Sequence, residues 1–366
     1  MQKTSRLPFI DAMKGVGCMA IVLHHLAIYG PMSEVVGQVA PNLIEGLILY
    51  ARLAVQMFFV LAGFMVASQM APEGHTVFRA PASLIWKRYK RLVTPFLFAV
   101  ACATLITAIV RPWFVHDSLS DAPSIAQLLA HALLMHDLLD LQALSAGVWF
   151  VAIDFQLFAA TVLMTALMHR TSEKWRAAFP ILIILLSAVS LFAINRYSAY
   201  ENYAPYFFGA YGLGMLSYWS TRPARAGAGL AVICLLGVMA LILEFRNSVS
   251  VAFATAVLVS IASQMGWLAR WPKPGVLTWL GHRSYSIFLI HYGVCIAFNA
   301  IWSKLFPTGV VINALGMLAA VLTSVGAGAL LYRYVESQQG VIGRNKKTTL
   351  LLAAVIAALV IESITW

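Results

Sequence analysis

The first apolar stretch of the chain, FIDAMKGVGCMAIVLHHLAIYG, carries a lysine and two adjacent histidines. Lys14 and His25 are eleven residues apart, about three helical turns, so they share one helix face about 16 Å apart along the axis. His24 points away from that face by about 100°. An imidazole can act as a general base and a cation can bind a phosphorylated ligand. The alternative for each histidine is a structural role.

Three further ionisable residues lie in apolar segments: Arg52 in ARLAVQMFFV, Asp154 in GVWFVAIDFQLF and His291 in LGHRSYSIFLIHYGV. Placing a charge in a membrane costs about 2.5–3.5 kcal/mol on insertion scales, so such residues usually mark a site. A buried Asp154 must pair or take a proton, and pairing with Arg52 is as good an interpretation as direct chemistry. Arg52 could instead snorkel to the outer interface, and His291 could be a core polar residue.

A basic segment, SLIWKRYKRLVTPF, places Arg88 and Arg91 three residues apart. It either anchors the chain at the cytosolic face or clamps a phosphorylated ligand, since guanidinium binds phosphate with two parallel hydrogen bonds. The sequence therefore predicts two polar groups, one near the cytosol and one further out, with His291 between them. The inner group comprises Lys14, Arg88 and Arg91, and the outer group comprises His25, Arg52, Gln56 and Asp154.

The composition indicates a membrane protein. Of 366 residues, 61% are hydrophobic and 11% are charged, whereas soluble domains carry about 25% charged residues. This excludes an ordinary soluble enzyme, a disordered chain and a secreted disulfide scaffold, and it argues against a nucleic-acid partner despite a net charge of +11. The cysteines lie in apolar segments and are interpreted as small hydrophobic residues; they are Cys18, Cys102, Cys234 and Cys295.

Apolar runs of about 20 residues predict an all-α, polytopic bundle of 10–11 transmembrane helices. The expected spans are 9–29, 46–69, 92–110, 146–168, 178–195, 203–220, 226–243, 249–268, 283–303, 308–332 and 348–365. Residues 1–340 form the main transmembrane domain, and residues 341–366 add a C-terminal helix. Most of the 25 lysines and arginines fall inside when the N-terminus is cytoplasmic, which is the orientation predicted. No cleavable signal peptide is expected.

One outer segment, residues 111–145, is long and contains the amphipathic stretch SIAQLLAHALLMHDLL. We expect a helix lying on the outer membrane surface. A metal site is the alternative, but the histidines and aspartates of this segment fit no zinc spacing, and no metal is expected.

Six elements, in order, resemble the acyltransferase-3 family, the integral-membrane transferases that O-acylate bacterial sugars and surface polysaccharides. The resemblance covers about residues 6–336. Lys14 stands where the family has an arginine, and His25 matches the histidine that follows after ten residues. FFVLAGFMVA at 58–67 resembles FFVLSGF, and WKRYKRLVTPF matches the basic RR-x-x-R-x-x-P element.

The later elements continue the resemblance. WFVAIDFQLF resembles W-x-L-x-x-E-x-x-F with Asp154 in place of glutamate, LGHRSYSIFLIH matches G-x-x-S-Y-x-x-Y-L-x-H and places His291, and RYVE at 333–336 resembles the closing R-x-x-E. Lys14 departs from the family because lysine binds phosphate as a point charge rather than a fork. The extracytoplasmic hydrolase-like domain that some members carry is not expected here.

The resemblance implies transfer of an acyl group from cytosolic acyl-CoA to a hydroxyl of an extracytoplasmic or lipid-linked glycan. Acetyl is the default group, with succinyl or longer acyl groups open. His25 is the expected general base, with an acyl-histidine intermediate as the alternative route. The expected roles of the other residues are CoA phosphate binding by Lys14, Arg88 and Arg91, orientation of an imidazole by Asp154, oxyanion stabilisation by Arg52, and positioning of the thioester or acceptor by His291.

The implied setting is a bacterial inner membrane, with membrane lipid and proteins of polysaccharide synthesis as partners. Two other classes stay open. A proton-coupled transporter or exporter of a glycan or lipid carrier would also need buried His, Asp and Arg. A structural subunit of an export complex would tolerate replacement of His25 or His291.

Overall fold

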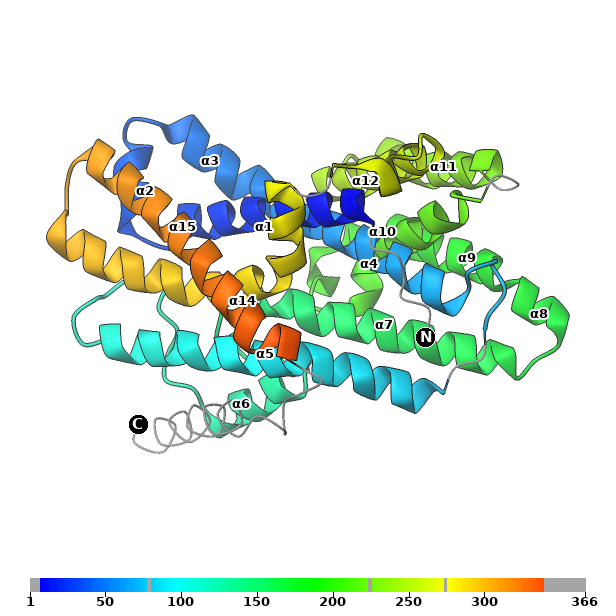
Figure 1. Ribbon diagram of the computed structural model, residues 1–366, viewed down its shortest axis with the longest axis horizontal. Coiled ribbons are helices and arrows are strands. Elements are labelled where there is room, and N and C mark those ends of the chain that lie inside the picture. Colours follow the sequence, from blue (N-terminus) through cyan, green and yellow to red (C-terminus); the bar gives the residue numbers. More distant parts are fainter. Residues whose placement is uncertain (1–6, 78–79, 223–225, 273–274, 339–366) are drawn as a thin grey trace. The chain divides into compact units, whose positions relative to one another are not determined.

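The computed structural model describes residues 7–77, 80–222, 226–272 and 275–338. Every regular element in these ranges is a helix (Figure 1), which confirms the predicted all-α class. The elements are α1 (Pro8–Ile28), α2 (Pro31–Gly37), α3 (Pro41–Tyr50), η1 (Ala51–Leu53), α4 (Ala54–Met70), α5 (Pro81–Val110), α6 (Ile125–Ala132), α7 (Val148–His169), α8 (Glu173–Ala177), α9 (Phe179–Phe192), η2 (Ile194–Arg196), η3 (Ser198–Tyr200), α10 (Ala204–Trp219), α11 (Ala226–Leu243), α12 (Asn247–Gln264), α13 (Trp267–Arg270), α14 (Val276–Leu305), α15 (Val310–Tyr334) and η5 (Glu336–Gln338).

Within the described ranges, nine helices are long and apolar enough to cross a membrane. The predicted spans from 9–29 to 308–332 each coincide with a described helix. One of them, α10, has 16 residues and does not reach spanning length, but most of its side chains are buried. The predicted C-terminal helix in 341–366 lies outside the described residues.

The helix predicted in the outer segment is α6, and it covers only the first half of the amphipathic stretch SIAQLLAHALLMHDLL. Ser124 caps α6 by accepting from the backbone N–H of Gln127, whose side chain accepts from the Ser124 N–H in return. This reciprocal capping box fixes where the helix starts. The helix ends at Ala132, and Leu134 takes a positive φ of 56°. The residues from 133 to 147 therefore form a connection rather than a helix.

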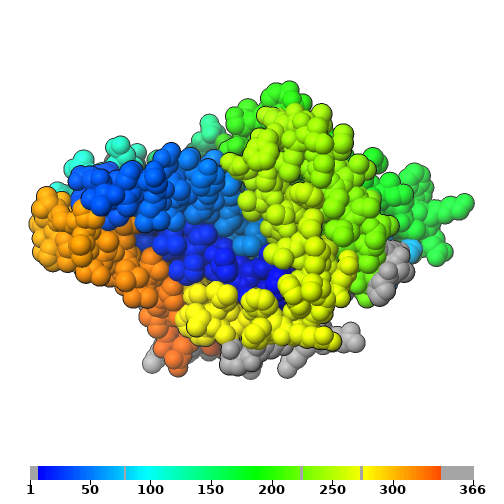
Figure 2. Space-filling view, turned by 90° about the horizontal axis from the view of Figure 1, so that it is seen from above, coloured from blue at the N-terminus to red at the C-terminus, as the bar shows by residue number. Residues whose placement is uncertain are grey.

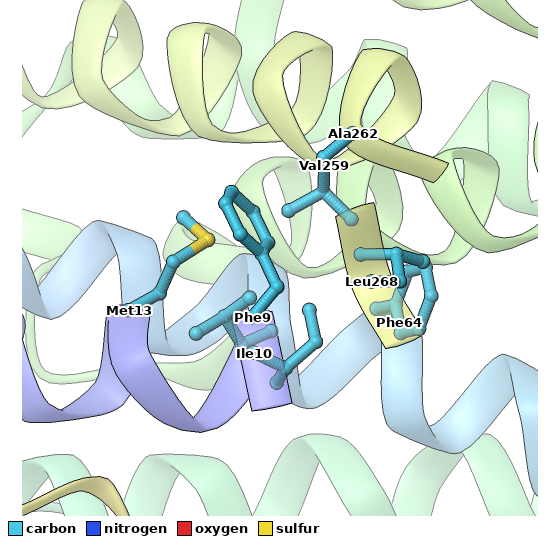
Figure 3. Close-up of a cluster of buried hydrophobic side chains, with 8 residues drawn as sticks. Phe9, Ile10, Met13, Phe64, Val259, Ala262 and Leu268 are labelled. Atoms are coloured by element: carbon cyan, nitrogen blue, oxygen red, sulfur yellow. The ribbon is translucent and has the colours of Figure 1, made fainter. Parts of the chain in front are cut away.

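The chain divides into two compact units, each assembled from separated segments. Unit 1 comprises Met1–Met13, Leu53–Tyr89 and Ile153–Thr278. Its apolar core joins the start of α1 to α4, α12 and α13, as Figure 3 shows for Phe9, Phe64 and Leu268. Glycines allow α4 and α10 to approach closely, because a Cβ on Gly63 would overlap the backbone of Tyr211. Small residues serve the same purpose at many membrane helix interfaces.

Unit 2 comprises Lys14–Arg52, Lys90–Ala152 and Trp279–Trp366. Helix α15 packs on α2, and the orange and blue segments adjoin in Figure 2. One apolar cluster of this unit joins α5 to α14 through Ala103 and Ile296, with Phe114 and Ala146 from the connection between α5 and α7. Both predicted catalytic histidines belong to this unit.

Candidate active site

Helices α1 and α14 form a parallel pair with one fixed register. The Cys18 thiol donates to the Ser284 carbonyl at 3.3 Å, and a ring nitrogen of His25 lies 2.7 Å from one of His291. Both contacts join residues 266 positions apart, so the two helices run in the same direction. Cys18 and His25 are seven residues apart, as are Ser284 and His291, and seven residues are about two helical turns. The two contacts therefore lie on the same face of each helix. The face predicted to carry Lys14 and His25 is therefore the face that meets α14.

The two histidines are linked through their ring edges. His25 Nδ1 lies 2.7 Å from His291 Nε2, and His291 Nδ1 lies 2.6 Å from the Phe288 carbonyl oxygen. A carbonyl can only accept, so His291 Nδ1 carries a proton and donates it. In a neutral imidazole the other nitrogen is then an acceptor, so His25 Nδ1 donates to His291 Nε2. This leaves His25 Nε2 with a lone pair.

Burial and aromatic contacts hold this pair in place. His25 is 8% exposed and His291 is fully buried. Tyr29 stacks on the His25 ring with centroids 5.4 Å apart, and Tyr292 meets Tyr29 edge to face. The Tyr292 hydroxyl donates to the Ser118 carbonyl at 2.7 Å, which ties the outer segment to this cluster. The stacking with Tyr29 and the hydrogen bond to His291 restrict the imidazole to one orientation.

His24 has a different role. Its Nδ1 lies 3.2 Å from the Leu47 carbonyl oxygen, so this ring is turned toward α3 rather than toward His291. Arg52, in η1, is exposed and lies within electrostatic range of His24. The sequence placed Arg52 beside a developing oxyanion, but its side chain is exposed at the surface of the protein.

Three consecutive residues of α14 anchor three different elements. Ser284 accepts from Cys18 in α1, the Tyr285 hydroxyl donates to the Leu92 carbonyl in α5 at 2.8 Å, and the Ser286 hydroxyl donates to Glu336 at 2.6 Å. Lys14 lies one turn before Cys18, and Arg91 directly precedes Leu92. These bonds gather α1, α5 and η5, the short helix after α15, around one turn of α14.

Electrostatics supports the same grouping. The Glu336 carboxylate interacts favourably with both Arg91 and Lys14. The structure thus brings together two of the three cations predicted to bind phosphate, with a carboxylate that the sequence analysis recorded only as the end of the R-x-x-E element. The His25–His291 contact lies about two turns, roughly 10 Å, further along α14.

Arg88 differs from the prediction. In unit 1 its Nη2 lies 2.5 Å from Asp154 Oδ2, and its guanidinium lies over the Phe158 ring at 5.3 Å. The sequence put Arg88 in an inner loop and Asp154 near the outer surface, with Arg52 as the suggested partner, and that placement is wrong.

The physical reason lies in where the two helices begin. Helix α5 starts at Pro81, eleven residues before the predicted span, so Arg88 lies on the helix rather than in a loop. Helix α7 starts at Val148, so Asp154 lies in its second turn, where it is buried at 6% exposure. Each residue supplies the opposite charge that the other needs when it leaves water.

The outer segment holds a second pair of histidines. The rings of His131 and His136 stack with centroids 4.1 Å apart, and Asp137 lies 3.4 Å from His136. Burial lowers the pKa of His136 to about 3 and raises the pKa of Asp137 to about 6. Among the described residues, no group of three or more His, Cys, Asp and Glu side chains is placed to hold a metal ion.

Gly147 is a site residue that the sequence analysis did not single out. It has a φ of +75°, and a Cβ there would lie 2.8 Å from Phe288 Cζ and 3.6 Å from His25 Cε1. Only glycine combines this backbone conformation with so close an approach. The sequence signal is a glycine two residues before Trp149, at the start of a predicted span.

Comparison with known proteins defines the class. The model of the acyltransferase-3 family, described as an acyltransferase domain, matches residues 7–333, and the chain belongs to this family. The match contains both histidines, the basic segment and the Arg88–Asp154 pair.

The curated relatives that the chain matches are O-acetyltransferases. The chain is 22% identical over 366 residues to the O-acetyltransferase OatA of Staphylococcus aureus strains NCTC 8325, COL and MRSA252, covering 90% of this chain and 57% of each relative. It therefore spans little more than half the length of these relatives. No solved structure matches.

Proposed function

We propose that this protein is a membrane O-acyltransferase that moves an acyl group, acetyl by default, from cytosolic acyl-CoA to a hydroxyl of an extracytoplasmic or lipid-linked glycan. Family membership and the named activity of the O-acetyltransferase relatives support the reaction class. The single observation that carries the proposal is the hydrogen-bonded series from the Phe288 carbonyl through His291 to His25, because it leaves a basic nitrogen at His25 Nε2.

In this proposal His25 Nε2 removes the proton of the acceptor hydroxyl as the oxygen attacks the thioester carbon. His291 keeps His25 Nδ1 protonated and accepts its hydrogen bond, which stabilises the positive charge that forms on His25. A positioned general base contributes typically about 10²–10⁴-fold to rate. In the alternative route, His25 Nε2 itself attacks the thioester, forming an acyl-histidine that the acceptor then cleaves.

Lys14 and Arg91 are the proposed phosphate-binding cations, because they lie around the same turn of α14 and share the Glu336 carboxylate. Arg88 carries less of this role than the sequence suggested. Its ion pair with Asp154 is neutral overall, so it attracts an anion more weakly than Lys14 and Arg91 do.

The charge distribution supports a cytoplasmic N-terminus, since it places most lysines and arginines on the cytosolic side. The basic segment and Lys14 would then face cytosolic acyl-CoA, and the glycan would approach from the other side. The proposed location is the inner membrane of a bacterium, with membrane lipid and proteins of polysaccharide synthesis as partners.

The proposal is tested by measuring binding of CoA and turnover of acyl-labelled acetyl-CoA by liposome-reconstituted protein. We expect saturable CoA binding that falls about 10–100-fold in Arg91→Ala, from loss of charge-assisted hydrogen bonds. Lys87→Ala removes an exposed charge from the same segment and should bind as the wild type does. Folded wild-type protein that binds neither acetyl-CoA nor succinyl-CoA would contradict the proposal and favour a transporter.

A further inference from the structure

The first turn of α7 lies directly against the proposed catalytic base. Gly147, the residue before α7, is placed so that a Cβ on it would lie 3.6 Å from His25 Cε1. Two residues into the helix, the Phe150 ring meets the Phe288 ring edge to face, with centroids 5.7 Å apart. Phe288 also provides the carbonyl that accepts from His291. Independent contacts therefore place the start of α7 beside the two histidines.

This helix end presents backbone donors. The first N–H groups of an α-helix have no intrahelical acceptor, and the helix dipole adds partial positive charge there. The Phe150 N–H donates back to the Gly147 carbonyl at 3.1 Å, so that carbonyl turns into the helix. Gly147 has no side chain and a φ of +75°, which lets its backbone lie close to the imidazole. Such helix ends bind anions.

A second observation points to a ligand at this place. His25 is 8% exposed, and among the described residues its Nε2 has no hydrogen-bond partner, while Nδ1 is committed to His291. Both ring nitrogens are bonded to Cε1, the ring atom that lies 3.6 Å from the Cβ position of Gly147, and of the two only Nε2 is not committed to His291. An uncommitted basic nitrogen on a largely buried histidine and a set of backbone donors thus lie near each other, as a reaction that develops a negative oxygen requires.

We propose that the backbone N–H groups at the start of α7, from Gly147 and Val148, stabilise the oxyanion of the acyl-transfer reaction. This inference rests on the proposed function. As the acceptor oxygen bonds to the thioester carbon, its proton moves to His25 Nε2 and the carbonyl electron pair moves onto oxygen. The N–H groups hold that oxyanion. When it collapses, the carbon–sulfur bond breaks and CoA leaves as a thiol with the proton from His25.

The assignment replaces Arg52 in this role. Arg52 is exposed, whereas Val148, the first residue of α7, is 1% exposed. Fixed backbone dipoles stabilise developing charge well, since they need no reorganisation during the reaction.

The test removes one N–H without removing the helix. Val148→Pro deletes the N–H at the first helical position, where proline is tolerated, and Val148→Ala keeps that N–H. We expect Val148→Pro to lower kcat by about 10²–10³-fold, the loss typical of one oxyanion donor. The KM for acetyl-CoA, the affinity for CoA and the pH profile of kcat/KM should match those of Val148→Ala, because His25 and the phosphate-binding cations are unchanged.

Two controls keep the outcomes distinct. Asn247→Pro removes the corresponding N–H from α12, in unit 1, and should retain full turnover. Where Val148→Pro does not fold, the α-hydroxy acid analogue of valine at position 148 removes the same N–H and keeps the side chain. Folded protein lacking this N–H that turns over like Val148→Ala would overturn the inference. Wild-type protein that binds CoA but transfers no acyl group would instead contradict the proposed function.

Discussion

Two pairs of buried histidines lie in unit 2, and they are built differently. His25 and His291 meet through ring nitrogens 2.7 Å apart. His131 and His136 meet face to face, with ring centroids 4.1 Å apart. In the first pair a carbonyl fixes the proton positions from one end and leaves a basic nitrogen at the other. In the second pair the rings fill space beside Phe96.

The difference extends to the hydrogen bonds around each pair. His131 uses both nitrogens structurally, with Nδ1 2.7 Å from the Gln127 carbonyl and Nε2 accepting from the Leu144 N–H. Neither nitrogen of His136 has a hydrogen-bond partner in the part of the chain that the structure describes. A buried histidine is therefore suited to catalysis when one ring nitrogen is held by a hydrogen bond and the other is available to accept a proton. Burial alone does not distinguish the two pairs.

The largest expected effect separates the pairs by activity. His25→Ala should lower kcat by about 10²–10⁴-fold, because it removes the proposed base. His24→Ala removes the neighbouring ring, which bonds to Leu47 instead, and should retain turnover per folded molecule. Steady-state kinetics with acetyl-CoA in liposomes measures both. Equal losses in the two variants would show that the effect is structural.

The next prediction concerns the orienting partner. His291→Phe keeps an aromatic ring but offers no acceptor to His25 Nδ1, so His25 loses its preferred tautomer. We expect a loss in kcat of at least about 10²-fold, with about 10⁴-fold as the upper limit set by a protease histidine that loses its tautomer partner. His291→Gln can accept from His25 through its amide oxygen and should recover part of the loss. Unchanged kcat in His291→Phe would argue against this role.

A smaller effect is expected on stability alone. His131→Ala leaves the buried Leu144 N–H without its acceptor, which costs about 1–3 kcal/mol. The apparent unfolding temperature in detergent should fall while turnover per folded molecule stays unchanged. A selective loss of kcat with normal stability would instead place the second pair in the reaction.

The smallest effect is a pH dependence of stability. The pKa of His136 is lowered to about 3 by burial, so the unfolded chain binds more protons below about pH 6.5 and stability falls on acidification. The pKa of Asp137 is raised to about 6, so the folded state binds the extra proton between about pH 4 and 6, and this opposes the fall.

Asp137→Asn should therefore lose more stability than the wild type between pH 6 and pH 4, and His136→Phe should lose less. Unfolding temperatures measured across this range test the signs. Identical curves for the three proteins would mean that these two groups titrate as they do in the unfolded chain.

The sequence predicted the spans and the α1 face that meets α14 well, for local reasons. Apolar runs of about 20 residues mark membrane helices, and helical periodicity placed Lys14 and His25 on one face. The contact between His25 and His291 could not be predicted, because it depends on the register of two helices 266 residues apart.

Other parts of the site were missed because they depend on where helices begin. Arg88 and Arg91 are three residues apart, yet Arg88 pairs with Asp154 in unit 1 and Arg91 interacts with Glu336 in unit 2. The importance of Gly147 could not be predicted, because it depends on α7 beginning beside His25. A single sequence shows which residue types are present, but helix starts and packing decide which of them meet.

The most direct test of the central claim is the protonation of His25 in the membrane. Nitrogen-15 solid-state NMR of histidine-labelled protein in liposomes, assigned with His25→Ala and His291→Gln, reports each ring nitrogen separately. Our account predicts that at pH 7 His25 and His291 are neutral, each protonated at Nδ1, with Nε2 of His25 bearing the lone pair. A proton on His25 Nε2 at that pH would contradict its role as the base.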